Sequence, residues 1–355
     1  MTDTRVSERE AVRLAVVGVG YWGPNLIRNF RACPDTELLW VCEAIEQRAR
    51  RAIEADSPIR VTPSFQEVLD DDRVEAVAIA TPPETHAELG TVALSAGRHG
   101  LMEKPLAPTV ESASALVRLA AERNLVLMSD HTYCYTPAVQ KIRELVQDGV
   151  LGDLYYFDSV RINLGLIQTT VDVVWDLAPH DLSILDFILP SGGFPSEISA
   201  HLSDPLGIGR ASVGHLTLPL SSGGIGHIHV NWLSPVKIRR TILSGSRKML
   251  VWDDLAPGQR ISLFDSGVDL ASSISDAKRH ELFVSYRVGD MVAPALPERE
   301  ALAMVAGEFA AAIRESRPPM TDGNAGLRVV RALTAAETSA ACRGAYVPLS
   351  ADSQQ

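Results

Sequence analysis

A regular alternation of short apolar runs and helical patterns, which continues to about residue 130, limits this chain to a small number of folds. A β-branched run at residues 13–19 ends in a glycine-rich turn, and a helical pattern follows at residues 24–32. Further strands are predicted at residues 38–42, 74–80, 99–102 and 126–128, and further helices at residues 45–55, 84–96 and 110–123. Strands and helices that alternate in this way are joined by right-handed crossovers and build a parallel sheet. We therefore predict an α/β fold in which residues 1–129 form a doubly wound, Rossmann-type domain.

The rhythm changes after this point, which indicates a second domain over residues 130–345 and a short tail at residues 346–355. Its strands are predicted at residues 211–218, 226–232, 238–244 and 249–252, and helices at residues 298–315 and 327–341 close the chain. Clusters of Gly, Ser, Asp and Pro separate these strands, as is typical of antiparallel hairpins. We expect an α+β domain with an open, mostly antiparallel sheet. A chain of 355 residues is long enough for two such domains.

Composition and charge exclude several classes of partner. The formal net charge of −11 disfavours binding to nucleic acid or to an anionic bilayer. The apolar runs, such as residues 184–189, are far shorter than the roughly 20 residues of a membrane-spanning helix. The charged N-terminus lacks the apolar core of a secretory signal, and the four cysteines lack paired spacing, so we expect a cytoplasmic protein with reduced thiols.

The glycine-rich turn fits the dinucleotide-binding fingerprint GxGxxG. It consists of Gly18, Gly20 and Gly23 with Tyr21 and Trp22 between the last two glycines. The glycines allow a tight turn, a close approach of backbone to pyrophosphate, and close packing of helix on strand, while amides at the helix N-terminus meet the phosphate charge. A turn that merely suits glycine is the alternative, but the position between the first strand and the first helix favours a cofactor site.

The end of the second predicted strand carries Glu43, 25 residues after Gly18. An acidic side chain at this place accepts hydrogen bonds from the adenine-ribose hydroxyls and repels a 2′-phosphate, which predicts a preference for NAD(H). A solvated glutamate at the start of a helix is the alternative. Arg48 lies near enough in sequence to offer a cation to a phosphate, so NADP(H) stays possible.

Three further segments carry a resemblance to a known family. Residues 80–83 read Ala-Thr-Pro-Pro, residues 103–106 read Glu-Lys-Pro-Leu, and residues 175–181 read Trp-Asp-Leu-Ala-Pro-His-Asp. With these segments the chain resembles, from Gly18 to the terminal helices, the glucose–fructose oxidoreductase / inositol dehydrogenase / rhizopine-catabolism (Gfo/Idh/MocA) family. Residues 131–133 and 161–165 look most like the sugar-nucleotide dehydrogenases, whose substrates resemble UDP-linked N-acetylated uronic sugars oxidised at C3.

The resemblance implies an open-faced sheet domain that assembles dimers or tetramers, and it implies roles for particular residues. Lys104 resembles the catalytic lysine, His180 the acid/base histidine and Asp176 the acidic member of the same motif. The loop beside the nicotinamide and its ribose corresponds to Thr81, Pro82 and His86, and the cofactor-facing glutamate corresponds to Glu103. Two departures are Glu43, where aspartate is commoner, and Ser129-Asp130 before His131, where glycine is usual. They bear on cofactor preference and on local loop shape.

Oxidation of a secondary alcohol requires a base within hydrogen-bond reach of the hydroxyl, and a fixed cation stabilises the charge that develops on its oxygen. His180 and Lys104 supply these groups, and we expect them to converge in the cleft between the domains. If Asp176 caps a helix whose first turn contains Pro179, His180 lies near the helix N-terminus, where the helix dipole keeps its ring neutral. Asp176, or less favourably Asp181, orients the ring. A helix cap, a structural histidine and a surface lysine are the alternatives.

Other polar residues are weaker candidates. Arg161 and Asn163 share one face of a predicted strand and, with Tyr133, are possible substrate contacts, although half-buried polar residues are common on sheets. His227 and His229 also share a face, but no third ligand is placed by the sequence, so we predict no metal site.

Together these patterns predict an NAD(H)-dependent oxidoreductase that transfers hydride to or from a secondary alcohol or ketone carbon of a sugar, at C3 of a nucleotide-linked sugar. The alternatives are a keto-sugar reductase, a free polyol or inositol dehydrogenase, a glycosidase that uses NAD transiently, and a non-catalytic nucleotide-binding protein. We also predict a cis or sharply constrained peptide between Lys104 and Pro105, and a homodimer or homotetramer formed through the second sheet.

Overall fold

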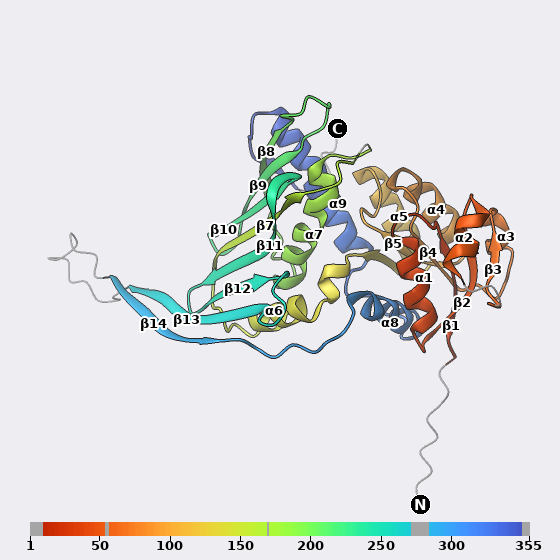
Figure 1. Cartoon of the computed structure of the whole chain (residues 1–355), viewed down its shortest axis with the longest axis horizontal. Helices are drawn as coiled ribbons and strands as arrows, with labels where there is room; N and C mark the ends of the chain where they lie inside the picture. Colours follow the sequence, from red (N-terminus) through yellow and green to blue (C-terminus); the bar gives the residue numbers. More distant parts are fainter. Residues whose placement is uncertain (1–9, 54–56, 169, 271–283, 350–355) are drawn as a thin grey trace, which may run out of the picture. The chain divides into compact units, whose positions relative to one another are not determined.

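The computed structural model describes residues 10–53, 57–168, 170–270 and 284–349, and it divides into two compact units (Figure 1). The first unit contains residues up to Thr136 together with Arg299–Val330, and the second contains Pro137–Glu298 and the residues from Arg331 onward. The first unit therefore includes a segment from the C-terminal part of the chain, which our division at residue 129 assigns to the second domain.

The first unit is built on a six-stranded sheet with the order β3-β2-β1-β4-β5-β6. The strands are β1 (Val12–Val17), β2 (Thr36–Cys42), β3 (Arg60–Thr62), β4 (Ala76–Ile79), β5 (His99–Glu103) and β6 (Leu127–Asp130). All neighbouring pairs are parallel. The strand order reverses between β1 and β4, as in a Rossmann fold, which confirms the predicted fold class. The central strand β4 is buried along its whole length because helices cover both faces of the sheet.

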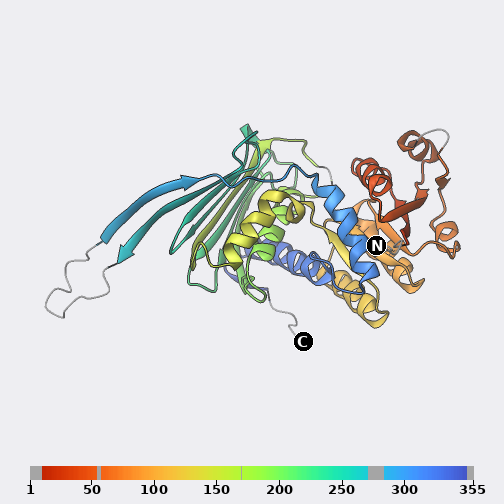
Figure 2. The ribbon, with the colours of Figure 1, turned by 90° about the horizontal axis from the view of Figure 1, so that it is seen from below.

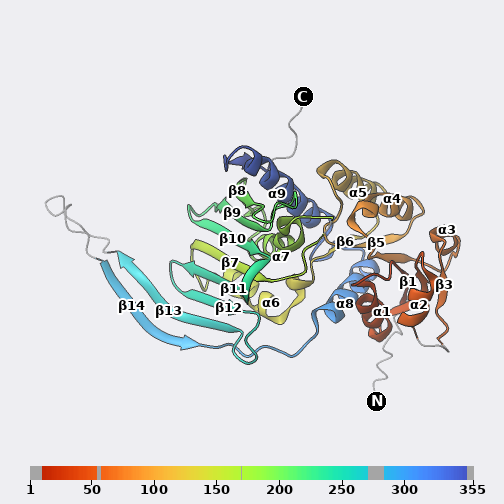
Figure 3. The same ribbon diagram turned by 45° about the horizontal axis from the view of Figure 1, so that its top comes forward.

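Helices of the first unit follow the strands and use clear capping signals. They are α1 (Gly23–Ala32), α2 (Glu46–Ala52), α3 (Phe65–Leu69), α4 (His86–Ser95), α5 (Val110–Glu122) and α8 (Ala301–Arg314), with short 3₁₀ turns η1 (Pro83–Thr85) and η2 (Thr132–Tyr135). Thr109 forms a capping box with Ser112 at the start of α5. α8 lies beside α1, where Phe309 packs edge-on against Phe30 at 6.4 Å between ring centroids (Figures 1 and 3).

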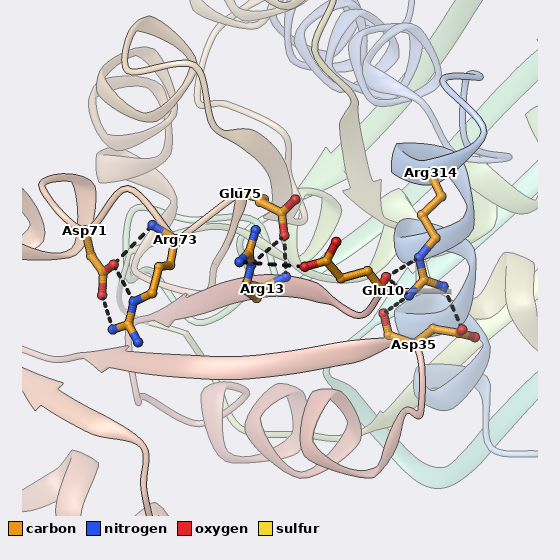
Figure 4. A network of polar contacts seen from close by, with 7 residues as sticks. All are labelled: Glu10, Arg13, Asp35, Asp71, Arg73, Glu75 and Arg314. Carbon is orange, nitrogen blue, oxygen red and sulfur yellow. Dashed lines mark hydrogen bonds and ion pairs between the residues drawn. The ribbon is translucent and has the colours of Figure 1, made fainter. Parts of the chain in front are cut away.

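A polar network fixes the end of α8 to the start of the sheet (Figure 4). Arg314 donates to the Asp35 carboxylate at 2.6 Å and to the Glu10 backbone carbonyl at 2.9 Å. Next to it, Arg13 donates to Glu75 at 3.1 Å across β1 and the start of β4. The figure also shows the pair Asp71 and Arg73, joined by two side-chain hydrogen bonds of 2.9 and 2.6 Å. α8 is thus an integral part of the first unit.

The second unit is built on a nine-stranded sheet with the order β14-β13-β12-β11-β7-β10-β9-β8-β15. The strands are β7 (Leu154–Leu164), β8 (Glu197–Ser203), β9 (Val213–Pro219), β10 (Ile225–Asn231), β11 (Leu233–Gly245), β12 (Met249–Asp253), β13 (Ile261–Leu270), β14 (Val284–Val292) and β15 (Val347–Pro348). β7 and β10 are parallel and the other pairs are antiparallel. This confirms the predicted open, mostly antiparallel sheet.

One face of this sheet is covered by α7 (Val173–Ile188), which packs on β7, β9 and β10 (Figure 3). The remaining helices are α6 (Pro137–Gln147), which lies beside α7 (Figure 2), and α9 (Gly323–Ala341). The residues of α9 from Arg331 onward belong to the second unit. A Cβ atom at Gly214 of β9 would lie 2.9 Å from a side chain of α7, and one at Gly226 of β10 would lie 3.7 Å from another. Even-numbered residues of β9 and β10 therefore face this helix. Within the described residues no helix is long and apolar enough to cross a membrane.

Candidate active site

The glycine-rich turn has the backbone geometry that a phosphate site requires. Gly18 has φ +93°, and a Cβ atom there would lie 2.8 Å from the Ala80 backbone. A Cβ atom at Gly23 would lie 2.2 Å from the Gly18 carbonyl, whereas one at Gly20 would meet no atom within 4 Å. Gly18 and Gly23 therefore close the turn, and Gly20 leaves open space beside the backbone for a ligand.

The start of α1 suits an anion. Its first turn contains no acidic residue, and the Trp22 side chain does not cap its amides. Free amides and the positive end of the helix dipole both favour a phosphate here. The Tyr21 ring beside this turn is 95% exposed.

Glu43 lies at the end of β2 but has a second task that the sequence does not reveal. Its carboxylate accepts hydrogen bonds from the backbone amides of Val19, at 2.7 Å, and Ile45, at 3.0 Å. It thereby ties the glycine-rich turn to the loop after β2. A carboxylate offers about four acceptor positions, so two remain for ribose hydroxyls. Arg48 is exposed on the following helix.

His86 holds two loops of the first unit together. Its buried ring lies between the backbone carbonyls of Pro105, 2.8 Å from Nδ1, and Thr81, 2.9 Å from Nε2. Burial lowers the pKa of this histidine, so the ring is neutral and donates to one carbonyl at a time. His86 therefore fixes the loop of Thr81 and Pro82 against the loop that follows Lys104.

Lys104 directly follows β5 and precedes a cis peptide bond to Pro105, as predicted. Its backbone amide donates to the Glu103 carboxylate at 3.0 Å, and its side chain is half-buried. Glu103 is directly paired in register with Asp130, the last residue of β6. Two carboxyl groups thus meet beside the lysine at the carboxyl end of the sheet.

Two further side chains near Lys104, those of His131 and Arg328, were assigned no role of their own from the sequence. His131 is 1% exposed, and burial, with the positive charges of Lys104 and Arg328, lowers its pKa to about 3. Arg328 reaches this place from α9, because a glycine at position 326 lets the helix approach Leu106 and Ser129 closely. Nothing in the local sequence around Arg328 signals this contact. Tyr133, a predicted substrate contact, lies half-buried in η2.

In the second unit, α7 carries Asp176 and His180, but the helix begins earlier than predicted. Its N-cap is Asp172, whose carboxylate accepts from the amides of Val174 at 2.9 Å and Trp175 at 3.0 Å. Asp176 is therefore a first-turn residue and not the cap, and Pro179 lies inside the helix. His180 lies two turns from the N-terminus, so the helix dipole acts on it less than we expected.

Asp176 and His180 are four residues apart and share one face of α7. The Asp176 carboxylate accepts a hydrogen bond of 3.1 Å from Nε1 of Trp232, whose ring is buried. Asn163 lies nearby, because a Cβ atom at Gly165 would meet both the Asn163 amide, at 2.7 Å, and the Trp232 ring, at 3.4 Å. Trp232, which stands between β10 and β11, thus lies beside both Asp176 of α7 and Asn163 of β7.

Arg161 and Asp181 form a buried ion pair. Two hydrogen bonds join them, from Nε to Oδ2 at 2.8 Å and from Nη2 to Oδ1 at 3.0 Å, and Ser159 donates to the same carboxylate at 2.8 Å. Asp181 is thus engaged with Arg161 and not with the His180 ring, which corrects our expectation for Asp181. Arg161 is 4% exposed, so its guanidinium joins β7 to α7.

His227 and His229 both point away from α7, and His229 stacks on His215 at 4.1 Å between ring centroids. Among the residues that the structure describes, no group of three or more His, Cys, Asp or Glu side chains could hold a metal ion.

Both halves of the chain match known proteins. Residues 12–131 match an oxidoreductase family with an NAD-binding Rossmann fold, and residues 139–251 match the GFO/IDH/MocA C-terminal domain. The UDP-N-acetylglucosamine 3-dehydrogenase of Acidithiobacillus ferrooxidans is 28% identical over 334 residues, which are 90% of this chain and 95% of that protein. A dTDP-3,4-didehydro-2,6-dideoxy-α-D-glucose 3-reductase of Streptomyces violaceoruber is 34% identical over 149 residues, which are 41% of this chain and 43% of the reductase.

Solved structures agree with this similarity. A structure of the Acidithiobacillus ferrooxidans 3-dehydrogenase superposes with a TM-score of 0.75 at 26% identity, covering 92% of this chain and 96% of its own. An enzyme of gentamicin A biosynthesis, solved in complex with NAD, shares the fold with a TM-score of 0.78 at 23% identity, covering 97% and 98% of the two chains.

Proposed function

Because the chain belongs to the Gfo/Idh/MocA family of NAD-dependent sugar oxidoreductases, we propose that it transfers hydride between NAD and C3 of a nucleotide-linked sugar. The observation that carries the choice of substrate is the similarity to a UDP-N-acetylglucosamine 3-dehydrogenase over 90% of the chain. The glycine-rich turn, with open space at Gly20 and an uncapped helix start, fits the dinucleotide pyrophosphate.

The proposed mechanism uses Lys104 and His180 on the same substrate hydroxyl. When bound, NAD would supply the hydride acceptor. His180 takes the hydroxyl proton, and the Lys104 ammonium stabilises the negative charge that develops on the oxygen. Asp176, one turn before His180 and held by Trp232, positions this part of the site, and Tyr133 and Asn163 bind sugar hydroxyls. Glu43 holds the adenine ribose.

The experiment is an absorbance assay of NADH with a panel of substrates: UDP-N-acetylglucosamine, its uronic acid, free inositol and free aldoses. We expect the UDP-sugars to be oxidised fastest. Lys104→Ala and His180→Ala should each lower kcat by about 10²–10⁴-fold and leave the Kd of NAD nearly unchanged. Lys141→Ala and Glu122→Ala, at two residues outside the proposed site, are controls that should keep wild-type turnover.

Other outcomes would assign other functions. Faster oxidation of free inositol would indicate a polyol dehydrogenase, and release of free sugar without net NADH would indicate a glycosidase. Faster turnover of a nucleotide-linked keto-sugar with NADH would favour the reductase direction, to which the 34% identity with the dTDP-sugar reductase points. Binding of NAD and sugar without any turnover would indicate a nucleotide-binding protein.

We further propose that the chain forms a homodimer or homotetramer through the sheet face that α7 does not cover. This face carries apolar side chains of four neighbouring strands, namely Ile225 of β10, Val160 of β7, Ile242 of β11 and Val251 of β12. The same face also carries polar side chains, among them Asp158, His227 and Arg240, so it is a mixed face. A large sheet face that no helix covers is normally covered by a partner subunit. Light scattering at micromolar concentration should give at least twice the 38.4 kDa mass of the chain, and a monomer mass would reject the proposal.

A further inference from the structure

Glu103 and Asp130 meet where two parallel strands end. Glu103 is the last residue of β5, Asp130 is the last residue of β6, and the two are direct register partners. Neighbouring strands lie about 4.8 Å apart, so the two side chains project side by side. Asp130 is 1% exposed, and the Glu103 Oε1 atom is fully buried. These carboxyl oxygens are therefore removed from bulk water.

The hydrogen-bond donors around this carboxyl pair are too few for two ionised groups. Asp130 accepts from the Thr132 hydroxyl at 2.8 Å and from Nε1 of Trp22 at 3.4 Å, and Glu103 Oε2 accepts from the Lys104 amide at 3.0 Å. Glu103 Oε1 has no donor among the residues that the structure describes. One proton held between the carboxyl groups satisfies this oxygen and removes the repulsion of two buried charges.

Burial and nearby charges both act on the protonation of the pair. Burial raises the pKa of Glu103 and of Asp130, and the charge of Asp130 raises that of Glu103 further. The positive charge of Lys104 lowers the pKa of both groups, but it ranks after burial among the causes for each of them. The other titratable groups that face the pair come from η2, its N-cap and α9: they are His131, Tyr135 and, through His131, Arg328. His131 is neutral because its pKa is about 3, and Tyr135 is neutral because burial raises its pKa.

The pair lies on the nicotinamide side of the cofactor site. A dinucleotide crosses the carboxyl ends of the strands where the strand order reverses, which is between β1 and β4 in this sheet. Glu43 and the glycine-rich turn mark the half over β1 and β2 as the adenine half. The nicotinamide half then falls on the side of β4, β5 and β6, where the pair stands. Trp22 belongs to the glycine-rich turn and contacts Asp130, so the cofactor turn and the pair are adjacent.

We propose that Glu103 and Asp130 share one proton and lie beside the nicotinamide in the cofactor site. When the pair loses this proton, its added negative charge favours binding of the cationic oxidised nicotinamide over binding of the neutral reduced ring. As the pH rises, the pair gains a second negative charge that attracts the positive ring of NAD⁺. Binding of NAD⁺ should therefore release protons, and the affinity for NAD⁺ relative to NADH should increase with pH. The inference rests on cofactor binding by the family and not on the proposed sugar substrate.

The test is the Kd of NAD⁺ and of NADH, measured by calorimetry between pH 6 and 9 without any sugar. In the wild type, the ratio of the two affinities should increase with pH, by at most about tenfold per pH unit for a single proton. Calorimetry of NAD⁺ binding in two buffers of different ionisation enthalpy should detect the released proton. In Asp130→Asn the ratio should not change with pH and no proton should be released, because one carboxyl group beside Lys104 stays ionised. Glu103→Gln should behave in the same way.

Controls separate this effect from damage to the fold. Asparagine keeps one oxygen, which can accept from the Thr132 hydroxyl, and loses only the acceptor of the long 3.4 Å bond from Trp22. As a control, Glu122→Gln, at an exposed glutamate on α5, should reproduce the wild-type ratio. Infrared spectra of the cofactor-free protein at pH 7 should show the carbonyl band of a protonated acid in the wild type and its loss in Asp130→Asn. A ratio that is flat with pH in the wild type, an unchanged slope in Asp130→Asn, or no infrared difference would overturn the proposal. A protein that fails to oxidise any sugar would leave these results unaffected.

Discussion

The ion pair of Arg161 and Asp181 gives the sharpest test of whether Arg161 is structural or contacts substrate. Asp181→Asn changes the charge but almost nothing in shape, so no cavity forms and the bond from Ser159 can persist. The Arg161 guanidinium then stays buried without the carboxylate that accepts two of its hydrogen bonds. Removing one partner of a buried pair costs about 3–5 kcal/mol, since the remaining charge loses its hydrogen-bonded counter-charge. We expect the free energy of unfolding to fall by this amount.

The assay is urea denaturation followed by tryptophan fluorescence, with Asp253→Asn as the matched control. Asp253 pairs with Arg240 on the same sheet, but its partner is 52% exposed, so the loss should be below about 1 kcal/mol. The double variant Arg161→Met with Asp181→Leu should recover most of the stability, because it removes both charges together. A loss below about 1 kcal/mol in Asp181→Asn, combined with a large rise in the KM of the sugar, would refute a structural role and make Arg161 a substrate contact.

Three further predictions concern the first unit. Gly20→Ala should keep wild-type stability but weaken NAD binding, measured by calorimetry, because the added Cβ atom meets no protein atom and enters the space for the ligand. Gly18→Ala should instead lower the melting temperature, because the φ angle of residue 18 is +93° and its Cβ atom would lie 2.8 Å from the Ala80 backbone. Glu43→Ser should lower the preference for NAD over NADP, and equal ratios of the two Kd values in wild type and variant would contradict this cause. The pKa of His131 is lowered from 6.5 to about 3 in the folded chain. As the pH falls, the histidine is therefore protonated in the unfolded chain before it is protonated in the folded chain. The free energy of unfolding then decreases as the pH falls from 6.5 towards 3. At 1.36 kcal/mol per pKa unit the loss reaches roughly 5 kcal/mol, and urea titrations of His131→Leu should show a flatter dependence on pH.

The fold of each half could be predicted because its local signals agree with one another. In the first half, the alternation of strands and helices and the glycine-rich turn both favour one parallel sheet. In the second half, strands separated by clusters of Gly, Ser, Asp and Pro favour an antiparallel sheet. The start of α7 was predicted wrongly for a local reason. Pro179 suggested a first turn, but Asp172 has the capping contacts, and the helix tolerates the one hydrogen bond that proline removes.

The surroundings of the predicted site residues depend on contacts between distant segments, which the sequence does not contain. Lys104 and Glu103 could be found because they stand in a recognisable motif after a strand. Asp130 was noticed only as a departure from glycine, since its importance comes from its register with Glu103. Arg328 had no signal at all, because it reaches His131 only after α9 packs on the ends of β5 and β6.

The return of residues 299–330 to the first unit has a consequence for biosynthesis. When the ribosome has made residues up to Thr136, the six-stranded sheet is complete but α8 has not been translated. Phe30 then lacks Phe309, and Asp35 lacks Arg314, until more than half of the remaining chain has emerged. Until α8 is made, the nascent cofactor unit therefore exposes an apolar surface on α1. Chaperones bind surfaces of this kind. A stand-alone cofactor unit for laboratory use accordingly needs residues 299–330 joined behind residue 136 and not a simple truncation.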